Sequence, residues 1–109
     1  MRFLLAAIAA LAISFFAPQT VMADGAGVFS ANCAACHAGG GNLVNPERTL
    51  SQADLKSFLA NYASDHEAAI VAQVTNGKNA MPSFDGVLSA SEISDVAAYV
   101  ESMSSKGWG

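Results

Sequence analysis

Two cysteines and a histidine stand close together in the motif Cys33-Ala34-Ala35-Cys36-His37. This C-x-x-C-H spacing is typical of covalent attachment of a c-type haem. Two thiols on one helical turn can add to the two vinyl groups of one porphyrin, and the next residue then offers an imidazole to the iron. The motif uses both cysteines of the chain. It predicts one covalently attached haem c, with Cys33 and Cys36 as thioether positions and His37 as an axial iron ligand.

The same cysteine pair has two other interpretations, a redox disulfide and half of a zinc site. A thioredoxin-like disulfide accompanies a βαβ pattern, which the sequence lacks. A zinc site needs further ligands, and His66 is the one other histidine. Haem attachment is therefore the stronger interpretation. A thiol–disulfide protein is the alternative, and it predicts two titratable thiols and no colour.

A second axial ligand would decide the function, and three side chains are candidates. Met81 precedes Pro82 in a segment without a helical pattern. Proline restricts the residue before it to an extended backbone, which would hold the thioether on a stiff loop. Met103 lies on an apolar helical stripe, where methionine is usually core filler. His66 lies beside two carboxylates in the first turn of an expected helix, where a solvated surface histidine is expected. We therefore predict Met81 as the second axial ligand.

Ligation by histidine and methionine predicts a one-electron carrier rather than an enzyme. A thioether ligand favours ferrous iron and raises the reduction potential. Two strong protein ligands leave no open iron position for oxygen or peroxide. The alternative is a haem enzyme or gas sensor, which requires that Met81 is not a ligand. Carbon monoxide binding by the reduced protein distinguishes the two.

The first 23 residues, 1–23, have the pattern of a cleaved secretory signal peptide. Met1-Arg2 is a positive start, and the apolar run Phe3–Ala17 is broken only by Ser14. That run is 15 residues long, shorter than the roughly 20 that span a bilayer. Val21-Met22-Ala23 then ends on a small residue, as a cleavage site requires. Cleavage would leave residues 24–109 as one cytochrome domain, which is expected to be soluble and without a membrane span.

The mature part is acidic, with four cationic residues against nine carboxylates, a formal balance of −5. This charge argues against nucleic acid as a partner. It favours partners that carry a positive docking patch. Export agrees with haem attachment, which takes place on the far side of a membrane. A domain this small usually needs a cofactor, metal or disulfide to be stable, so we expect the protein without haem to be poorly folded.

The mature chain has an all-α pattern, with no sustained apolar/polar alternation. Helices are expected over residues 24–36, 51–61, 64–76 and 89–106. Their start signals are Asp24, then Ser51 with Asp54 or Thr49 with Gln52, then the capping boxes Ser64–Glu67 and Ser89–Glu92. The last helix has an apolar stripe at i, i+3, i+4 and i+7, formed by Ile93, Val96, Ala97, Val100 and Met103.

The stretches between and after these helices contain helix breakers. A glycine cluster at 39–41 opens a long loop that would wrap the porphyrin edge, with a turn at Asn45-Pro46. Gly77 suits a left-handed end of the third helix. Residues 78–88 form a loop that contains Met81.

Three stretches resemble class I c-type cytochromes, and most of all the cytochrome c6 family. They are residues 24–42, residues 77–84 with the Met81-Pro82 pair, and residues 95–100 with Lys106-Gly107-Trp108. The resemblance implies the class I cytochrome c fold, with about four helices around one haem. It also implies that the first and last helices cross where Gly25 and Phe29 meet Val96 and Tyr99.

The resemblance further implies a role in photosynthesis. The carrier would take an electron from cytochrome f of the cytochrome b6f complex and pass it to photosystem I in the thylakoid lumen. Gln73 stands where high-potential members keep a glutamine near the haem. Val87 departs from the family, which commonly has an arginine there that is implicated in docking. The alternative is a periplasmic or lumenal cytochrome that donates electrons to a terminal oxidase.

Overall fold

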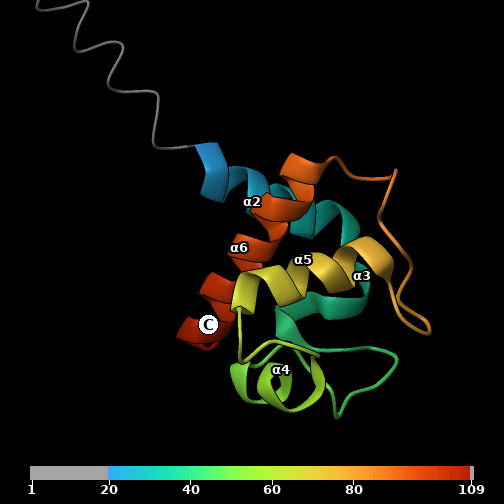
Figure 1. Cartoon of the computed structure of the whole chain (residues 1–109), viewed down its shortest axis with the longest axis vertical. Coiled ribbons are helices and arrows are strands. Elements are labelled where there is room, and N and C mark those ends of the chain that lie inside the picture. The colour runs from blue at the N-terminus through green and yellow to red at the C-terminus, as the bar shows by residue number, and fades with distance from the viewer. Residues whose placement is uncertain (1–19, 109) are drawn as a thin grey trace, which may run out of the picture.

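The computed structural model describes residues 20–108, and the side chains from Asp24 onward. The predicted signal peptide therefore lies mostly outside the described residues. The described part contains α2 (Thr20–Asn32), α3 (Ala34–His37), a 3₁₀ turn (Ala38–Gly40), α4 (Gln52–Phe58), α5 (His66–Asn76) and α6 (Ala90–Lys106) (Figure 1). No strand occurs among residues 20–108, only two isolated bridges between 78 and 88. The all-α prediction is confirmed.

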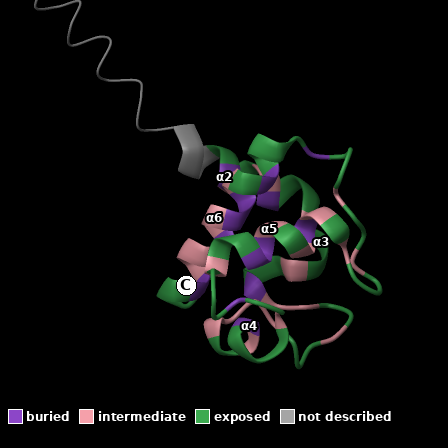
Figure 2. Cartoon of the chain, in the orientation of Figure 1, coloured by how far each residue is buried: buried purple, intermediate pink, exposed green. Residues whose placement is uncertain are grey.

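The last helix, α6, organises the domain because it contacts α2, α4 and α5. Its N-terminus has the predicted capping box, in which Ser89 Oγ accepts from the Glu92 N–H at 3.1 Å and Glu92 Oε1 accepts from the Ser89 N–H at 2.8 Å. It ends at Gly107, which is left-handed. Buried residues recur along α6, which contacts α2 and α5 (Figure 2). They are Ile93, Val96, Ala97, Val100 and Ser104.

The crossing of α2 and α6 depends on Gly25. A Cβ atom at this position would lie 2.4 Å from the carbonyl oxygen of Asp95 and 3.0 Å from Cβ of Tyr99. One turn further on, Phe29 packs on Tyr99 with ring centroids 5.3 Å apart. The predicted meeting of Gly25 and Phe29 with the last helix is therefore confirmed, and the backbones are too close for any side chain at Gly25.

We expect Gly25→Ala to lower the thermal stability of the holoprotein. The new methyl group meets backbone atoms of α6, which cannot rotate away, so the overpacking should cost about 1–3 kcal/mol. Each kcal/mol corresponds to roughly 4–8 °C in Tm for a domain of this size. Gly27→Ala is the matched control, because nothing lies within 4 Å of its Cβ position. That variant should gain up to about 1 kcal/mol from helix propensity. Equal Tm changes in the two variants would contradict the crossing.

The first predicted helix, 24–36, is wrong in both its start and its continuity. The helix begins at Thr20, so Asp24 lies inside it and does not cap it. It also ends at Asn32, because Cys33 forms a turn before the short helix α3. Helix-type hydrogen bonds still flank Cys33, whose N–H donates to the Phe29 carbonyl at 2.8 Å and whose carbonyl accepts from the His37 N–H at 2.9 Å. Because of the interruption at Cys33, the described part has five α-helices where about four were expected.

The two middle helices differ from the prediction at their ends. Ser51 caps α4 by accepting from the Asp54 N–H at 3.1 Å, so of the two proposed start signals Ser51 with Asp54 is confirmed. This helix stops at Phe58 rather than near residue 61, because Leu59 is extended. Helix α5 is capped by Asp65, which accepts from the Ala68 N–H, and not by the predicted Ser64.

Gly77 ends α5 in a different geometry from the left-handed one predicted. Its φ is 69° and its ψ is 177°, a region that is essentially restricted to glycine. A Cβ atom there would lie within 2.7 Å of backbone atoms of Met81, Pro82 and Ser83. Gly77 therefore lets the chain fold back tightly into the loop that carries Met81.

A buried polar cluster joins the α4–α5 connection to α6. Tyr62 is fully buried, and its hydroxyl donates to Glu101 Oε1 at 2.6 Å. His66 stacks on the Tyr62 ring at 4.0 Å, and its Nδ1 lies 2.9 Å from Glu101 Oε2. The His66 side chain is 36% exposed, so it lies at the surface as predicted, but it is paired with Glu101 rather than freely solvated. Partial burial alone would raise the pKa of Glu101, but the hydrogen bonds from Tyr62 and His66 outweigh it, and the net pKa is lowered.

We expect Glu101→Gln to destabilise the protein by about 1.5–3 kcal/mol at pH 7, the usual range for hydrogen bonds to a charged group. Because the pKa of Glu101 is lower in the folded state, its contribution exists above the unfolded value of about 4.3 and disappears as the pH falls through the folded pKa. Urea titrations from pH 7 to pH 3 measure the gap between the two proteins. A gap that stays constant down to pH 3 would show that the charge of Glu101 does not matter.

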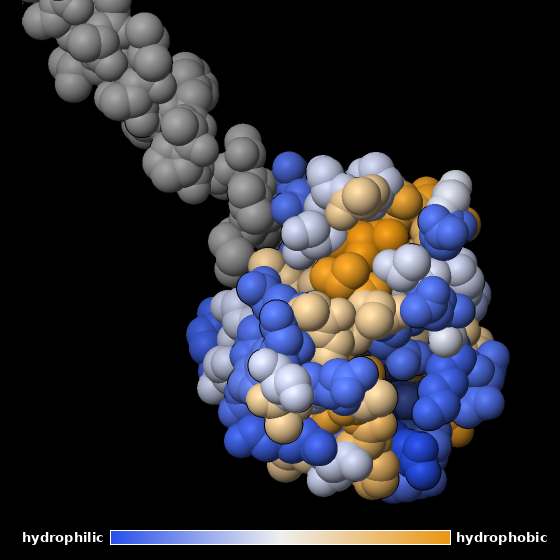
Figure 3. Space-filling view, viewed as in Figure 1, coloured by the Kyte–Doolittle hydropathy of each residue, from blue (hydrophilic) through white to orange (hydrophobic). Residues whose placement is uncertain are grey.

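Hydrophilic residues cover much of the face seen in Figure 3, around a strip of hydrophobic ones. None of the helices within residues 20–108 combines the length and hydrophobicity needed to cross a membrane.

Candidate haem site

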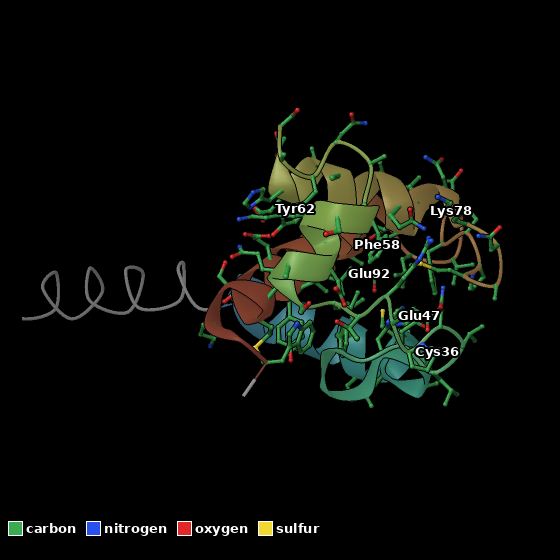
Figure 4. All side chains as sticks on the ribbon, turned by 90° about the horizontal axis from the view of Figure 1, so that it is seen from below. Cys36, Glu47, Phe58, Tyr62, Lys78 and Glu92 are labelled. Carbon is green, nitrogen blue, oxygen red and sulfur yellow. The ribbon has the colours of Figure 1, made fainter. Side chains whose placement is uncertain are left out.

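A cavity of about 410 Å³ opens between α2, α3, α4 and α5 and the loop that follows α5. Its walls include core side chains from four helices. They are Phe29, Leu55, Ile70, Val74, Val96 and Val100. The space therefore extends from the hydrophobic core to the surface, where the exposed Val44 also lines it. In Figure 4 the side chains of Cys36 and Lys78, which both line the cavity, lie on one side of the molecule and Tyr62 lies on the other.

The C-x-x-C-H motif forms one wall of this cavity. Cys33, Cys36 and His37 all line it, and a tight turn joins them, in which the N–H groups of Cys36 and His37 donate to the Cys33 carbonyl at 3.1 and 2.9 Å. Both thiols are free. Burial raises the pKa of the Cys33 thiol, whereas reactive redox cysteines have a lowered pKa.

The ring of His37 is oriented by a backbone carbonyl. Its Nδ1 lies 2.9 Å from the carbonyl oxygen of Gly41. A carbonyl only accepts, so Nδ1 carries the proton in this contact and Nε2 keeps its lone pair. Metal-bound histidines use the same arrangement, in which the second ring nitrogen donates to an acceptor behind it.

Met81 reaches the same cavity from the loop after α5. Two backbone hydrogen bonds between Lys78 and Met81, at 3.0 and 2.9 Å, close a tight turn. The Gln73 side-chain amide approaches the Met81 sulfur at 3.7 Å, and both residues line the cavity. Thus an imidazole, a thioether and two thiols, which are distant in sequence, share one apolar space.

The other candidate iron ligands do not share it. Neither His66 nor Met103 lines the cavity. His66 is held by Tyr62 and Glu101 on another side of α6. Met103 is half-buried near the end of α6, and among the described side chains it does not belong to the hydrophobic core cluster.

Some cavity residues were not singled out from the sequence. Arg48 lies over the Phe58 ring, 4.5 Å from its centroid, and both line the cavity together with Lys78. Asp54 also lines it, and hydrogen bonds from the Thr49 side chain and backbone lower its pKa. No local motif marks Arg48 or Lys78, since they reach the cavity only through the folding of the two loops.

The donor set and the walls fit a covalently held haem. Two thiols on one turn can form two thioethers, an imidazole and a thioether are the usual axial pair of c-type cytochromes, and apolar side chains surround them. The iron of such a haem supplies one-electron redox chemistry. The chain itself supplies attachment, ligands and exclusion of water.

Comparisons with known proteins agree with this site. A family model described as cytochrome c oxidase, cbb3-type, subunit III, matches residues 20–100. A cytochrome c6 of Limnospira maxima is 56% identical over 87 residues, which are 80% of this chain and 98% of the relative. One from Synechococcus sp. strain PCC 6312 is 58% identical over 87 residues, 80% of this chain and 74% of the relative.

A solved structure shows the same fold. Cytochrome c6 from the diatom Phaeodactylum tricornutum superposes with a TM-score of 0.74 at 50% identity, over 80% of this chain and 98% of the other. The class I cytochrome c fold is therefore confirmed. Together these findings show that the chain belongs to the cytochrome c6 family, whose members are electron carriers with a covalently bound haem c.

Proposed function

We propose that Cys33 and Cys36 hold the haem through thioether bonds and that His37 and Met81 are its axial ligands. The observation that carries this proposal is that all four side chains line one apolar cavity. The Gly41 carbonyl fixes His37 with Nε2 free to bind iron. Gln73 supports the other ligand, because its amide N–H points at the Met81 sulfur.

This ligand set suits a carrier that takes up and releases one electron without binding a substrate. Both axial positions are filled by the protein, and the apolar walls keep water from the iron. The carrier accepts its electron from cytochrome f of the cytochrome b6f complex and delivers it to photosystem I. Residues 1–23 direct export to the thylakoid lumen, or also to the periplasm, and are cleaved after Ala23.

The partners dock where the cavity reaches the surface. Val44 is 66% exposed and also lines the cavity. Leu43, its neighbour, is 73% exposed. Val87 is 65% exposed on the turn that begins at Phe84, another cavity residue. Weak electron-transfer complexes use small apolar patches of this kind.

Flash kinetics with photosystem I particles test the proposed role. Reduced holoprotein should re-reduce the oxidised photosystem in a second-order reaction that depends on salt. Val87→Arg, which restores the charge common in the family, should raise the rate several-fold at low salt, whereas Val87→Gln should not. A photosystem that recovers no faster with the protein than without it would contradict the proposed acceptor.

One observation favours a second acceptor, the matching family model, whose description names a subunit of an oxidase. On this alternative the same haem donates electrons to a terminal oxidase. Oxygen uptake by oxidase-containing membranes, measured with the reduced holoprotein as sole donor, distinguishes the two. Fast uptake together with no photosystem I reaction would favour the oxidase.

A further inference from the structure

The indole of Trp108 contacts two backbone segments beside the haem motif. Its Nε1–H donates to the carbonyl oxygen of Leu50 at 2.7 Å. Its ring lies against Gly40, where a Cβ atom would be only 2.4 Å from two ring atoms. The N–H of Leu50 in turn donates to the Gly40 carbonyl at 2.8 Å. Trp108 therefore holds together the two ends of the loop between Gly40 and Leu50.

The indole is itself firmly placed. Its ring centroid lies 5.4 Å from that of Phe29, and 6.2 Å from that of Tyr99 in an edge-on arrangement. The backbone N–H of Trp108 donates to the Met103 carbonyl at 2.9 Å, which continues the turn at the end of α6. Trp108 does not itself line the large cavity. It can influence the haem site by two routes, through Phe29, which lines the cavity, and through the backbone at Gly40 and Leu50.

The backbone at Gly40 and Gly41 orients the His37 ring. Gly40 has a φ of 79°, and the next residue, Gly41, supplies the carbonyl that accepts from His37 Nδ1 at 2.9 Å. Gly41 is tied on its other side by a hydrogen bond from its N–H to Ala38 at 3.1 Å. The direction of the Gly41 carbonyl thus depends on how Gly40 is held, and Trp108 and Leu50 hold it.

We propose that Trp108 is a positioning residue for His37. By clamping Gly40 against Leu50, it keeps the Gly41 carbonyl aimed at Nδ1, which fixes the ring orientation and the donor strength of Nε2. This inference rests on the proposed ligation of iron by His37. It assigns Trp108, which follows His37 by 71 residues in the sequence, to support of the axial ligand.

The exchange of the His37 Nδ1 proton, measured by NMR in the reduced holoprotein, tests this. Trp108→Ala loses the ring contact and the indole donor, so exchange should be about five- to tenfold faster, the factor that the loss of one ordinary hydrogen bond gives. Trp108→Phe keeps a ring on Gly40 and should show a smaller increase. Amide protons of α5 are the internal reference, because general destabilisation raises their exchange as well.

Ile93→Val is the matched control, because it shortens a buried side chain of α6. Ile93 does not line the large cavity, and it is not among the nearest neighbours of Gly40. It should leave the exchange of the His37 proton unchanged relative to α5. If Trp108→Ala does not fold, Trp108→Phe alone decides. Unchanged relative exchange in the folded variants would overturn the positioning role. A wild-type His37 ring without the large ring-current shifts of a haem ligand would instead refute the ligation on which the proposal rests.

Discussion

Met81→Ala should leave the haem attached but lower the reduction potential. Both thioether positions, Cys33 and Cys36, are untouched, so the protein stays coloured and covalently loaded. The loss of the thioether removes the ligand that favours ferrous iron. The fall should be on the order of a tenth of a volt or more, because axial ligands shift haem potentials over about 0.8 V. The reduced variant should also bind carbon monoxide, which the native protein should not.

The matched control for this variant is Met103→Leu. Met103 does not line the cavity, and the volumes of methionine and leucine are similar, so the change should cost less than about 1.5 kcal/mol and leave the potential unaltered. A native potential in Met81→Ala would remove Met81 from the ligand set. Carbon monoxide binding by the native protein would do the same, and would favour the haem enzyme or gas sensor.

The mature chain without haem should be largely unfolded at 25 °C. The cavity of about 410 Å³ is walled by core residues. Without haem these apolar walls are in contact with water and lack packing partners, whereas the whole free energy of unfolding of a small domain is only about 5–15 kcal/mol. The haem is therefore part of the core. This agrees with the expectation that so short a chain needs a cofactor or cross-link to be stable.

Circular dichroism of residues 24–109, produced with and without haem, measures this directly. The holoprotein should be strongly helical and melt cooperatively. The haem-free chain should have a weak helical signal and no cooperative transition. A haem-free chain with native helicity and a sharp melting transition would contradict the inference that the cavity must be filled.

Local chemistry in the sequence predicted the ends of some elements and not others. Ser89 and Glu92 predict the start of α6 correctly, because a capping box depends on only four consecutive residues and not on distant parts of the chain. The same pattern at Ser64 gave the wrong cap for α5. Asp65 beside it can cap a helix equally well, and the chain geometry before α5 decides between the two residues. The interruption at Cys33 has no helix breaker in the sequence to mark it, since neither glycine nor proline stands there.

The candidate site divides in the same way. The spacing of Cys33, Cys36 and His37 was enough to predict haem attachment. The proline after Met81 was enough to predict that this methionine lies on a stiff loop. The pairing of His66 and Tyr62 with Glu101 could not be predicted, because Glu101 lies 35 residues after His66 and 39 residues after Tyr62. The contact of Arg48 with Phe58 likewise depends on the folded loop rather than on any motif.

An optical redox titration of the matured holoprotein tests the central claim most directly. Ligation by His37 and Met81 predicts a single one-electron couple well above zero against the standard hydrogen electrode, since a thioether raises the potential. Such a couple would suit transfer from cytochrome f to photosystem I. A couple near or below zero would contradict the account, because it would require a different axial ligand and exclude the proposed photosynthetic role.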